Sequence, residues 1–117
     1  MSSNRENPPE APESTSALKQ LQAWYVANCN GEWEHSYGVK ISTLDNPGWH
    51  VEIELAGTPW VHLSIPRRSV DRSDGDWIDF QVSNARFVAY GGASNLEEML
   101  LEFLQLVHGE ASPRTTR

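Results

Sequence analysis

The fold is decided by residues 37–55, which read YGVKISTLDNPGWHVEIEL. Apolar or aromatic side chains alternate with small or polar ones on both sides of the segment Asp45-Asn46-Pro47-Gly48. A period of two is typical of a strand with one buried face, and Asp, Asn, Pro and Gly are turn residues. The stretch therefore predicts a β-hairpin with strands over residues 37–43 and 49–55.

The register of this hairpin follows from matching apolar side chains across the turn. That match sets Ile41 against Val51 and, one step away, Lys40 against Glu52, which is an attractive cross-strand pair. A shift by one residue would set apolar against polar throughout. We therefore expect a single, well-specified register.

Three more strands are predicted downstream. Residues 61–65 alternate up to Pro66, which cannot donate to a ladder, and we expect them to pair with residues 49–55. Residues 77–83 and 86–90 form a second hairpin, in which Val82 lies opposite Phe87. Residues 67–76 are mostly polar and are predicted to be a loop.

A helix is predicted at each end of this set of strands. The first runs from about residue 15 to residue 29 behind Ser14 or Ser16 as N-cap, with a stripe of Leu18, Leu21, Trp24 and Tyr25. The second begins at Ser94-Asn95-Leu96-Glu97, which reads as a capping box, and ends near residues 108–109. Its apolar residues recur at helical spacing.

The order α-β-β-β-β-β-α predicts an α+β fold. We expect an antiparallel sheet of about five strands, two hairpins plus one strand, arranged as a meander. The N-terminal and C-terminal helices pack on one face of the sheet, because each helix has a single apolar stripe to bury. The domain spans residues 14–110, and the polar, proline-containing residues 1–13 and the polar residues 111–117 are predicted to be disordered tails.

The second face of this sheet would be polar and exposed. It is predicted to be an acidic plate that also carries histidines, available to a partner. Its side chains would be those of Lys40, Ser42, His50, Glu52, Glu54, His62, Ser64, Asp79 and Gln81.

Composition limits the kinds of partner that the protein can bind and the cellular compartment in which we expect it. The 117 residues carry a net charge of −7, which argues against direct binding of nucleic acid and favours a basic protein partner. No apolar run reaches the roughly 18 residues of a membrane span, and the N-terminus lacks the apolar region of a secretory signal. We expect a cytoplasmic protein that does not enter a membrane. The single cysteine, Cys29, excludes an internal disulfide.

The residues that could support catalysis are Glu34, His35, Asp45 and His50. Zinc sites use three or four converging ligands, commonly in close pairs such as His-x-x-x-His, and the sequence has no such pair. Carboxylate catalysis needs a pocket, which a flat sheet face does not supply. We expect no metal, no cofactor and no enzymatic activity.

Three motifs resemble one known family. Residues 29–35 (CNGEWEH), 37–39 (YGV) and 43–49 (TLDNPGW), preceded by Trp24-Tyr25, are similar to the immunity protein 53 family of bacterial polymorphic toxin systems. The specific likeness covers about residues 18–55. It implies a small α+β antitoxin that binds and neutralises a cognate toxin domain made by the same cell, by occupancy and without turnover.

The resemblance and the charge together suggest the contact residues. Trp33 could cap the core or stand exposed as an anchor, and Asp45 lies in the family's turn motif. The charged plate contributes Glu52 and Glu54. A toxin that is a basic nuclease would suit such a surface. The candidate toxin-binding residues are Trp33, Glu34, His35, Asp45, Glu52 and Glu54. The alternatives are a binding subunit of an unrelated complex and a small metal- or carboxylate-dependent enzyme.

Overall fold

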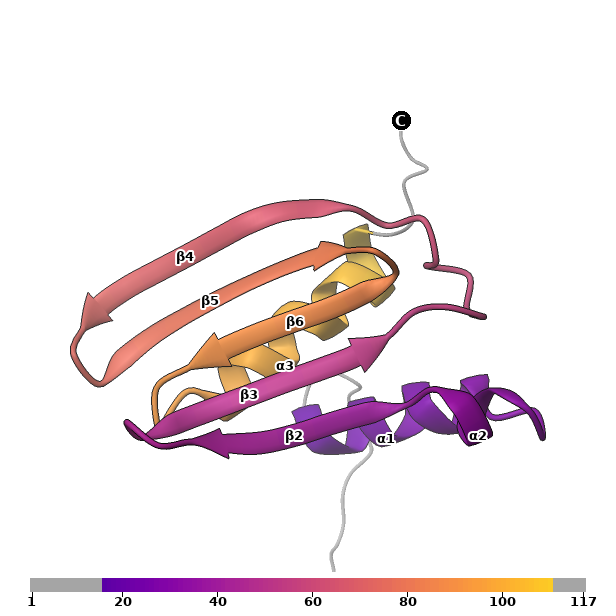
Figure 1. Cartoon of the computed structure of the whole chain (residues 1–117), viewed down its shortest axis with the longest axis horizontal. Helices are drawn as coiled ribbons and strands as arrows, with labels where there is room; N and C mark the ends of the chain where they lie inside the picture. The colour runs from indigo at the N-terminus through magenta and orange to yellow at the C-terminus, as the bar shows by residue number, and fades with distance from the viewer. Residues whose placement is uncertain (1–15, 111–117) are drawn as a thin grey trace, which may run out of the picture.

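The hairpin of residues 37–55 is present in the computed structural model, which describes residues 16–110 (Figure 1). Strands β2 (Val39–Leu44) and β3 (Gly48–Glu54) are antiparallel, with Ile41 opposite Val51 and Lys40 opposite Glu52. The predicted register is confirmed. The predicted tails, residues 1–13 and 111–117, lie outside the described residues.

The second hairpin also forms as predicted. Strand β5 (Asp76–Ser83) pairs with β6 (Arg86–Gly91), and Val82 lies opposite Phe87. The turn residues Asn84 and Ala85 both have positive φ, 53° and 59°. Two such residues in succession are the signature of the tight hairpin turn whose twist matches that of the strands.

The five strands lie in the order β2-β3-β6-β5-β4, and every neighbouring pair is antiparallel. The predicted α+β class with a five-stranded antiparallel sheet is confirmed. The predicted meander is wrong, because β3 pairs with β6, so the chain crosses to the far edge before it returns (Figure 1).

The predicted third strand, residues 61–65, is wrong. Residues 55–64 form a series of turns, in which the backbone N–H of Val61 donates to Thr58 O and that of Leu63 donates to Trp60 O. The Oγ1 of Thr58 donates to Leu55 O at 2.7 Å. Alternation failed here because Trp60 and Leu63 pack against the core without any strand pairing.

Most of the predicted polar loop over residues 67–76 is instead strand β4 (Ile65–Ser73), the outer partner of β5. The register shifts between Ile65 and Arg68, so Pro66 falls at an irregular position of an edge strand, where proline is tolerated. Polar side chains point to both faces of β4, and this hides the period of two. The helix-side residue Arg68 lies over the Phe80 ring at 5.9 Å.

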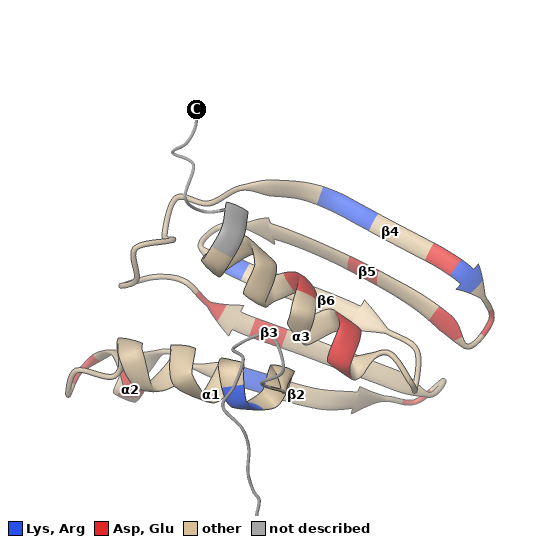
Figure 2. Ribbon diagram, turned by 180° about the vertical axis from the view of Figure 1, so that it is seen from behind, with Lys and Arg blue, Asp and Glu red and all other residues tan. Residues whose placement is uncertain are grey.

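The helices cover one face of the sheet, as predicted. Helix α1 (Ala17–Asn28), helix α3 (Leu96–Gln105) and the π-helical turn η2 (Leu106–Glu110) all lie on the same side (Figure 1, and from behind in Figure 2). Ser16 is the N-cap of α1, and its Oγ accepts from the Lys19 N–H at 3.1 Å. Between α1 and β2 lies the short helix α2 (Trp33–Ser36).

Two details of the helix predictions are wrong. Leu18 is 57% exposed, because the face of α1 that is buried carries Ala17, Leu21 and Trp24. The predicted capping box does not form, since the N-cap of α3 is Asn95, whose side chain makes no capping bond. Its amide instead donates to Asp76 and Glu98 at 3.0 Å each, and this joins α3 to β5.

The core lies between this helical layer and the sheet. Its aromatic centre is Phe103 of α3, whose ring meets Trp24 at 4.9 Å and Phe87 at 5.2 Å, both edge-on. Edge-to-face contacts of this kind add to the free energy gained by burial. The other large side chains that are fully buried are Val51, Ile53, Leu55, Ile78, Val82 and Met99.

Candidate functional site

The sheet face opposite the helices is called the open face here. It is made by residues that alternate with the buried ones, so Glu52 and Glu54 flank the core residue Ile53, and Asp79 lies between Ile78 and Phe80. The predicted members His62 and Ser64 are not on this face, because they lie in the turns before β4. Its charged and aromatic residues are Lys40, His50, Glu52, Glu54, Arg67, Trp77, Asp79, Arg86 and Tyr90.

The carboxylates of the open face have basic partners. Arg86 Nε lies 3.0 Å from Glu52 Oε2 and 3.2 Å from Glu54 Oε2, so two carboxylates share one guanidinium. Arg67 Nε donates to both carboxylate oxygens of Asp79, at 3.0 and 2.8 Å. The predicted acidic plate is therefore a mixed surface of acids and arginines.

The pKa of Asp79 lies below its ordinary value. The first cause is the hydrogen bonding from Arg67, to which Ser69 Oγ adds a bond at 2.9 Å. These bonds favour the ionised carboxylate more than its partial burial disfavours it. Asp79 is thus a fixed negative charge held by its neighbours.

Three of the six candidate residues meet at one hollow. His35, Glu52 and Glu54 line a cavity of about 250 Å³ together with Ser36, Tyr37, Gly38, Val39 and Lys40. His35 comes from α2 and the two glutamates from β3, and the first residues of β2 run between them. We call this cavity the acidic hollow after its two glutamates, although Lys40 also lines it and Arg86 pairs with both glutamates. It joins residues that lie 17 to 19 positions apart in the sequence.

Trp33 is a core residue. Only 4% of it is exposed, its Nε1 donates to Ala56 O at 2.8 Å, and its ring meets that of Trp24 at 5.8 Å. Of the two roles considered for Trp33, a cap on the core and an exposed anchor, the structure supports the first.

Glu34 closes the loop between α1 and α2. Its carboxylate accepts from the N–H groups of Asn30 and Gly31 at 2.9 and 2.8 Å. The pKa of Glu34 lies below its ordinary value because of a hydrogen bond from its own backbone, then these two. Gly31 has φ +94°, a conformation that favours glycine. Glu34 therefore has a local structural role.

Asp45 is exposed in the turn between β2 and β3. This turn lies at the far end of β2 from Val39 and the acidic hollow. Asp45 is therefore separated from the three residues that meet there.

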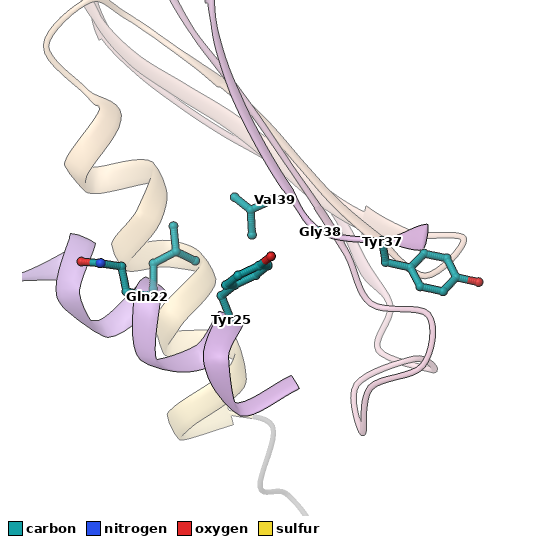
Figure 3. A pocket seen from close by; sticks show the side chains of 6 residues that line it. Gln22, Tyr25, Tyr37, Gly38 and Val39 are labelled. Atoms are coloured by element: carbon teal, nitrogen blue, oxygen red, sulfur yellow. The ribbon is translucent and has the colours of Figure 1, made fainter. Parts of the chain in front are cut away.

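A second feature, which the sequence analysis missed, is a groove between α1 and β2. It has a volume of about 360 Å³ and is lined by Leu21, Gln22, Tyr25, Tyr37, Gly38 and Val39. Figure 3 shows Val39 above the Tyr25 ring, with Tyr37 at one end. The sequence analysis assigned Leu21 and Tyr25 to the core. The sequence did contain a signal for unburied apolar surface on this helix. The predicted apolar stripe includes Leu18 and Tyr25, which α1 does not bury.

A third hollow, of about 310 Å³, lies on the open face over β5 and β6. It is lined by Arg67, Trp77, Asp79, Gln81, Val88 and Tyr90. Tyr90 stacks on His50 with ring centroids 4.8 Å apart. Trp77 and Tyr90 alternate with the buried residues of β5 and β6, and this alternation was the sequence signal that they lie on the open face. Of the residues that line this hollow, only Asp79 and Gln81 were assigned to the predicted plate.

The residues considered for catalysis are dispersed. Glu34 is engaged in its loop, His35 borders the acidic hollow, Asp45 lies in the turn, and His50 stacks on Tyr90. Within residues 16–110, no three His, Cys, Asp or Glu side chains are grouped so that they could hold a metal ion. None of the helices in that range has the length and apolar content of a membrane span.

A comparison with protein-family models gives a match over residues 18–108, to the model of immunity protein 53. The chain belongs to the immunity protein 53 family. The match extends the predicted resemblance, which was specific for residues 18–55, to almost all of the described chain. No curated protein and no solved structure matches it.

In this member of the immunity protein 53 family, the most recognisable motif residues support the fold. Trp33 is buried, and Trp49 Nε1 donates to Ala93 O at 2.9 Å. Gly48 is buried so close to β6 that a Cβ there would lie 2.3 Å from Gly91 O. Trp33 packs at the end of the hairpin next to α2, whereas Gly48 and Trp49 pack at the opposite end, beside the turn between β2 and β3.

Proposed function

We propose that this chain is an antitoxin that binds a cognate toxin domain made by the same bacterium and neutralises it by covering its active surface. Membership of the immunity protein 53 family is the observation that carries the proposal. Neutralisation by occupancy needs a rigid complementary surface and no turnover.

The acidic hollow is the proposed contact surface. His35, Glu52 and Glu54 are positioned by α2 and β3, and both carboxylates are tied to Arg86. Paired charges of this kind are already ordered before binding, which reduces the entropy lost when a partner docks. Trp33 is engaged in the core, Glu34 in the loop between α1 and α2, and Asp45 lies outside the proposed contact.

The partner surface is proposed to be basic. A net charge of −7 speeds encounter with a positively charged protein. A nuclease is the toxin class that fits best, since its cleft must attract phosphate. The antitoxin would act in the cytoplasm, where such a toxin would otherwise reach nucleic acid.

A rescue assay tests the proposal. The toxin domain encoded beside this gene is induced in a sensitive bacterial host with and without this chain. Survival is expected with the wild type and is expected to be lost with the double variant Glu52→Lys/Glu54→Lys. Lack of rescue by a folded, expressed wild type would contradict the proposed function.

A second double variant controls for charge. Asp74→Lys/Glu97→Lys alters net charge by the same amount at exposed positions of the β4–β5 turn and of α3. It should still rescue the host. Equal loss of rescue in both double variants would mean that overall charge, and not the acidic hollow, governs binding.

A further inference from the structure

We infer that the toxin contributes an extended strand, which pairs with the free edge of β2 and places alternate apolar side chains in the groove between β2 and α1. This inference rests on the proposed function and says how the partner is held. The sheet would grow by one strand taken from the other protein, which is a recognised mode of peptide and protein binding.

The two edges of the sheet differ in how they are protected. Strand β4 carries Pro66, register shifts near both ends and three arginines, Arg67, Arg68 and Arg72. Proline, irregular pairing and charge are the devices by which edge strands avoid pairing with other chains. Further strand addition at β4 is therefore disfavoured.

The edge formed by β2 has almost none of these devices. It pairs with β3 residue by residue from Val39 to Leu44 without a register shift, and its only charged residue is Lys40. Its other side has no strand neighbour within the described chain. Backbone N–H and C=O groups on that side are available to an incoming strand.

Apolar surface accompanies this open edge. Ile41 lies on the same face as the buried Val51 but is 39% exposed. In the adjoining groove, Tyr25 is 37% exposed and Tyr37 is 41% exposed. A strand beside β2 would cover these side chains, and its own apolar residues would fill the space between Val39 and Tyr25 (Figure 3).

The groove and the acidic hollow share the segment Tyr37-Gly38-Val39. Because side chains of a strand point alternately to the two faces, a partner strand that passes this segment would meet both sites. One set of its side chains would enter the apolar groove, and the other would face His35, Glu52 and Glu54. The partner strand should therefore alternate apolar with polar or basic residues.

A second copy of this chain fits the edge less well than a toxin strand. In an antiparallel pair of β2 strands centred on Ile41, Thr43 of one copy would face Val39 of the other, and Asp45 would face Tyr37. Polar residues would then meet the apolar groove. Each copy also carries a charge of −7, so the two copies would repel each other.

A matched pair of edge variants tests the inference by titration calorimetry, with the purified toxin domain made inactive by substitution. Ile41→Lys adds to β2 an inward-pointing charge of the kind that blocks edge pairing. Val70→Lys makes the same change on β4, at a β-branched residue that is 38% exposed and lies on the same sheet face. Ile41→Lys should weaken binding at least about tenfold, whereas Val70→Lys should change it by less than about threefold.

A pair of tyrosine variants tests the segment that the groove and the acidic hollow share. Tyr37 at the groove and Tyr90 on the open face are both 41% exposed. Tyr37→Ala should weaken binding about tenfold and Tyr90→Ala by less than about threefold. Circular dichroism and thermal unfolding of each variant establish that it is folded before it is titrated.

The outcomes separate the inference from the proposed function. Wild-type binding that survives Ile41→Lys and Tyr37→Ala would overturn strand addition at β2 and leave the proposed function standing. Absence of wild-type binding, together with no rescue, would overturn both. A wild type that is dimeric in sedimentation, with a monomeric Ile41→Lys variant, would assign the edge to self-association and overturn the inference.

Discussion

The two faces of the sheet contribute differently to stability and to binding. The helix-covered face buries Val51, Ile53, Phe80, Val82 and Phe87, all at 3% exposure or less. The open face carries charges in ion pairs, together with the exposed ring of Tyr90. Burial of apolar area supplies most of the stability, whereas exposed ion pairs add little. Stability is therefore concentrated on one face, and the other is available for binding.

The largest expected effect of a single substitution is on the covered face. Phe103→Ala removes the ring that joins Trp24 of α1 to Phe87 of β6, and should lower the free energy of unfolding by about 3–5 kcal/mol. Tyr90→Ala on the open face should lower it by less than about 1 kcal/mol. Urea denaturation measures both values, and equal losses would contradict the division between the faces.

A smaller effect is expected at the family's turn motif. Gly48→Ala would place a Cβ 2.3 Å from Gly91 O and 3.2 Å from a Leu44 side-chain carbon. Strands β3 and β6 must separate to admit it, so we expect a loss of about 1–3 kcal/mol. Gly38→Ala is the control, since a Cβ there would have no atom within 4 Å apart from those of its own residue and its two chain neighbours. A Gly48→Ala protein as stable as the wild type would show that this motif glycine is not needed for packing.

The smallest expected effect is on the open face and depends on pH. The pKa of Asp79 is lowered by Arg67, so ionised Asp79 stabilises the fold at pH values above the ordinary carboxyl pKa near 4. This stabilisation disappears as the pH falls through the lower folded-state value. Asp79→Asn should cost about 1 kcal/mol or less at pH 7 and should flatten the loss of stability below pH 4.

Arg67→Gln is the companion variant for this ion pair. Because it removes the other partner, it should flatten the same acid-dependent loss, and the double variant should add little further change. Thermal unfolding between pH 2 and pH 7 measures the difference. A steeper acid loss in Asp79→Asn than in the wild type would contradict the assignment.

Local patterns predicted the parts of the fold that depend on neighbours in sequence. Both hairpins have the predicted register, because apolar residues matched across short turns allow only one alignment. Helix α3 was predicted for a similar reason, since its buried residues recur at helical spacing. The sheet order could not be predicted in this way, because the pairing of β3 with β6 joins segments more than 30 residues apart.

The two wrong strand predictions concern segments in which the pattern of apolar side chains does not match the backbone pairing. Residues 61–65 alternate like a strand but fold as turns around Thr58 and Trp60. Strand β4 forms from a polar sequence because its backbone completes the edge of β5. The pairing of backbone groups at the edge of a sheet does not depend on an apolar side-chain pattern, so the sequence pattern did not predict it.

The candidate site could be predicted only in part. His35, Glu52 and Glu54 were selected for their charge or motif, and the sheet brings them to one hollow. Trp33 was selected for its motif and is buried, because family motifs record packing as well as binding. The groove between α1 and β2 was missed, since it depends on how far the helix lies from the edge strand.

Strand addition at β2 is tested by hydrogen exchange of the chain, measured free and bound to the inactive toxin domain. Amides of residues 37–44 should gain protection on binding, because unpaired edge groups of β2 enter a new ladder. Amides of β4 should exchange at the same rate in both states. Protection gained on β4 while β2 is unchanged would contradict strand addition at β2.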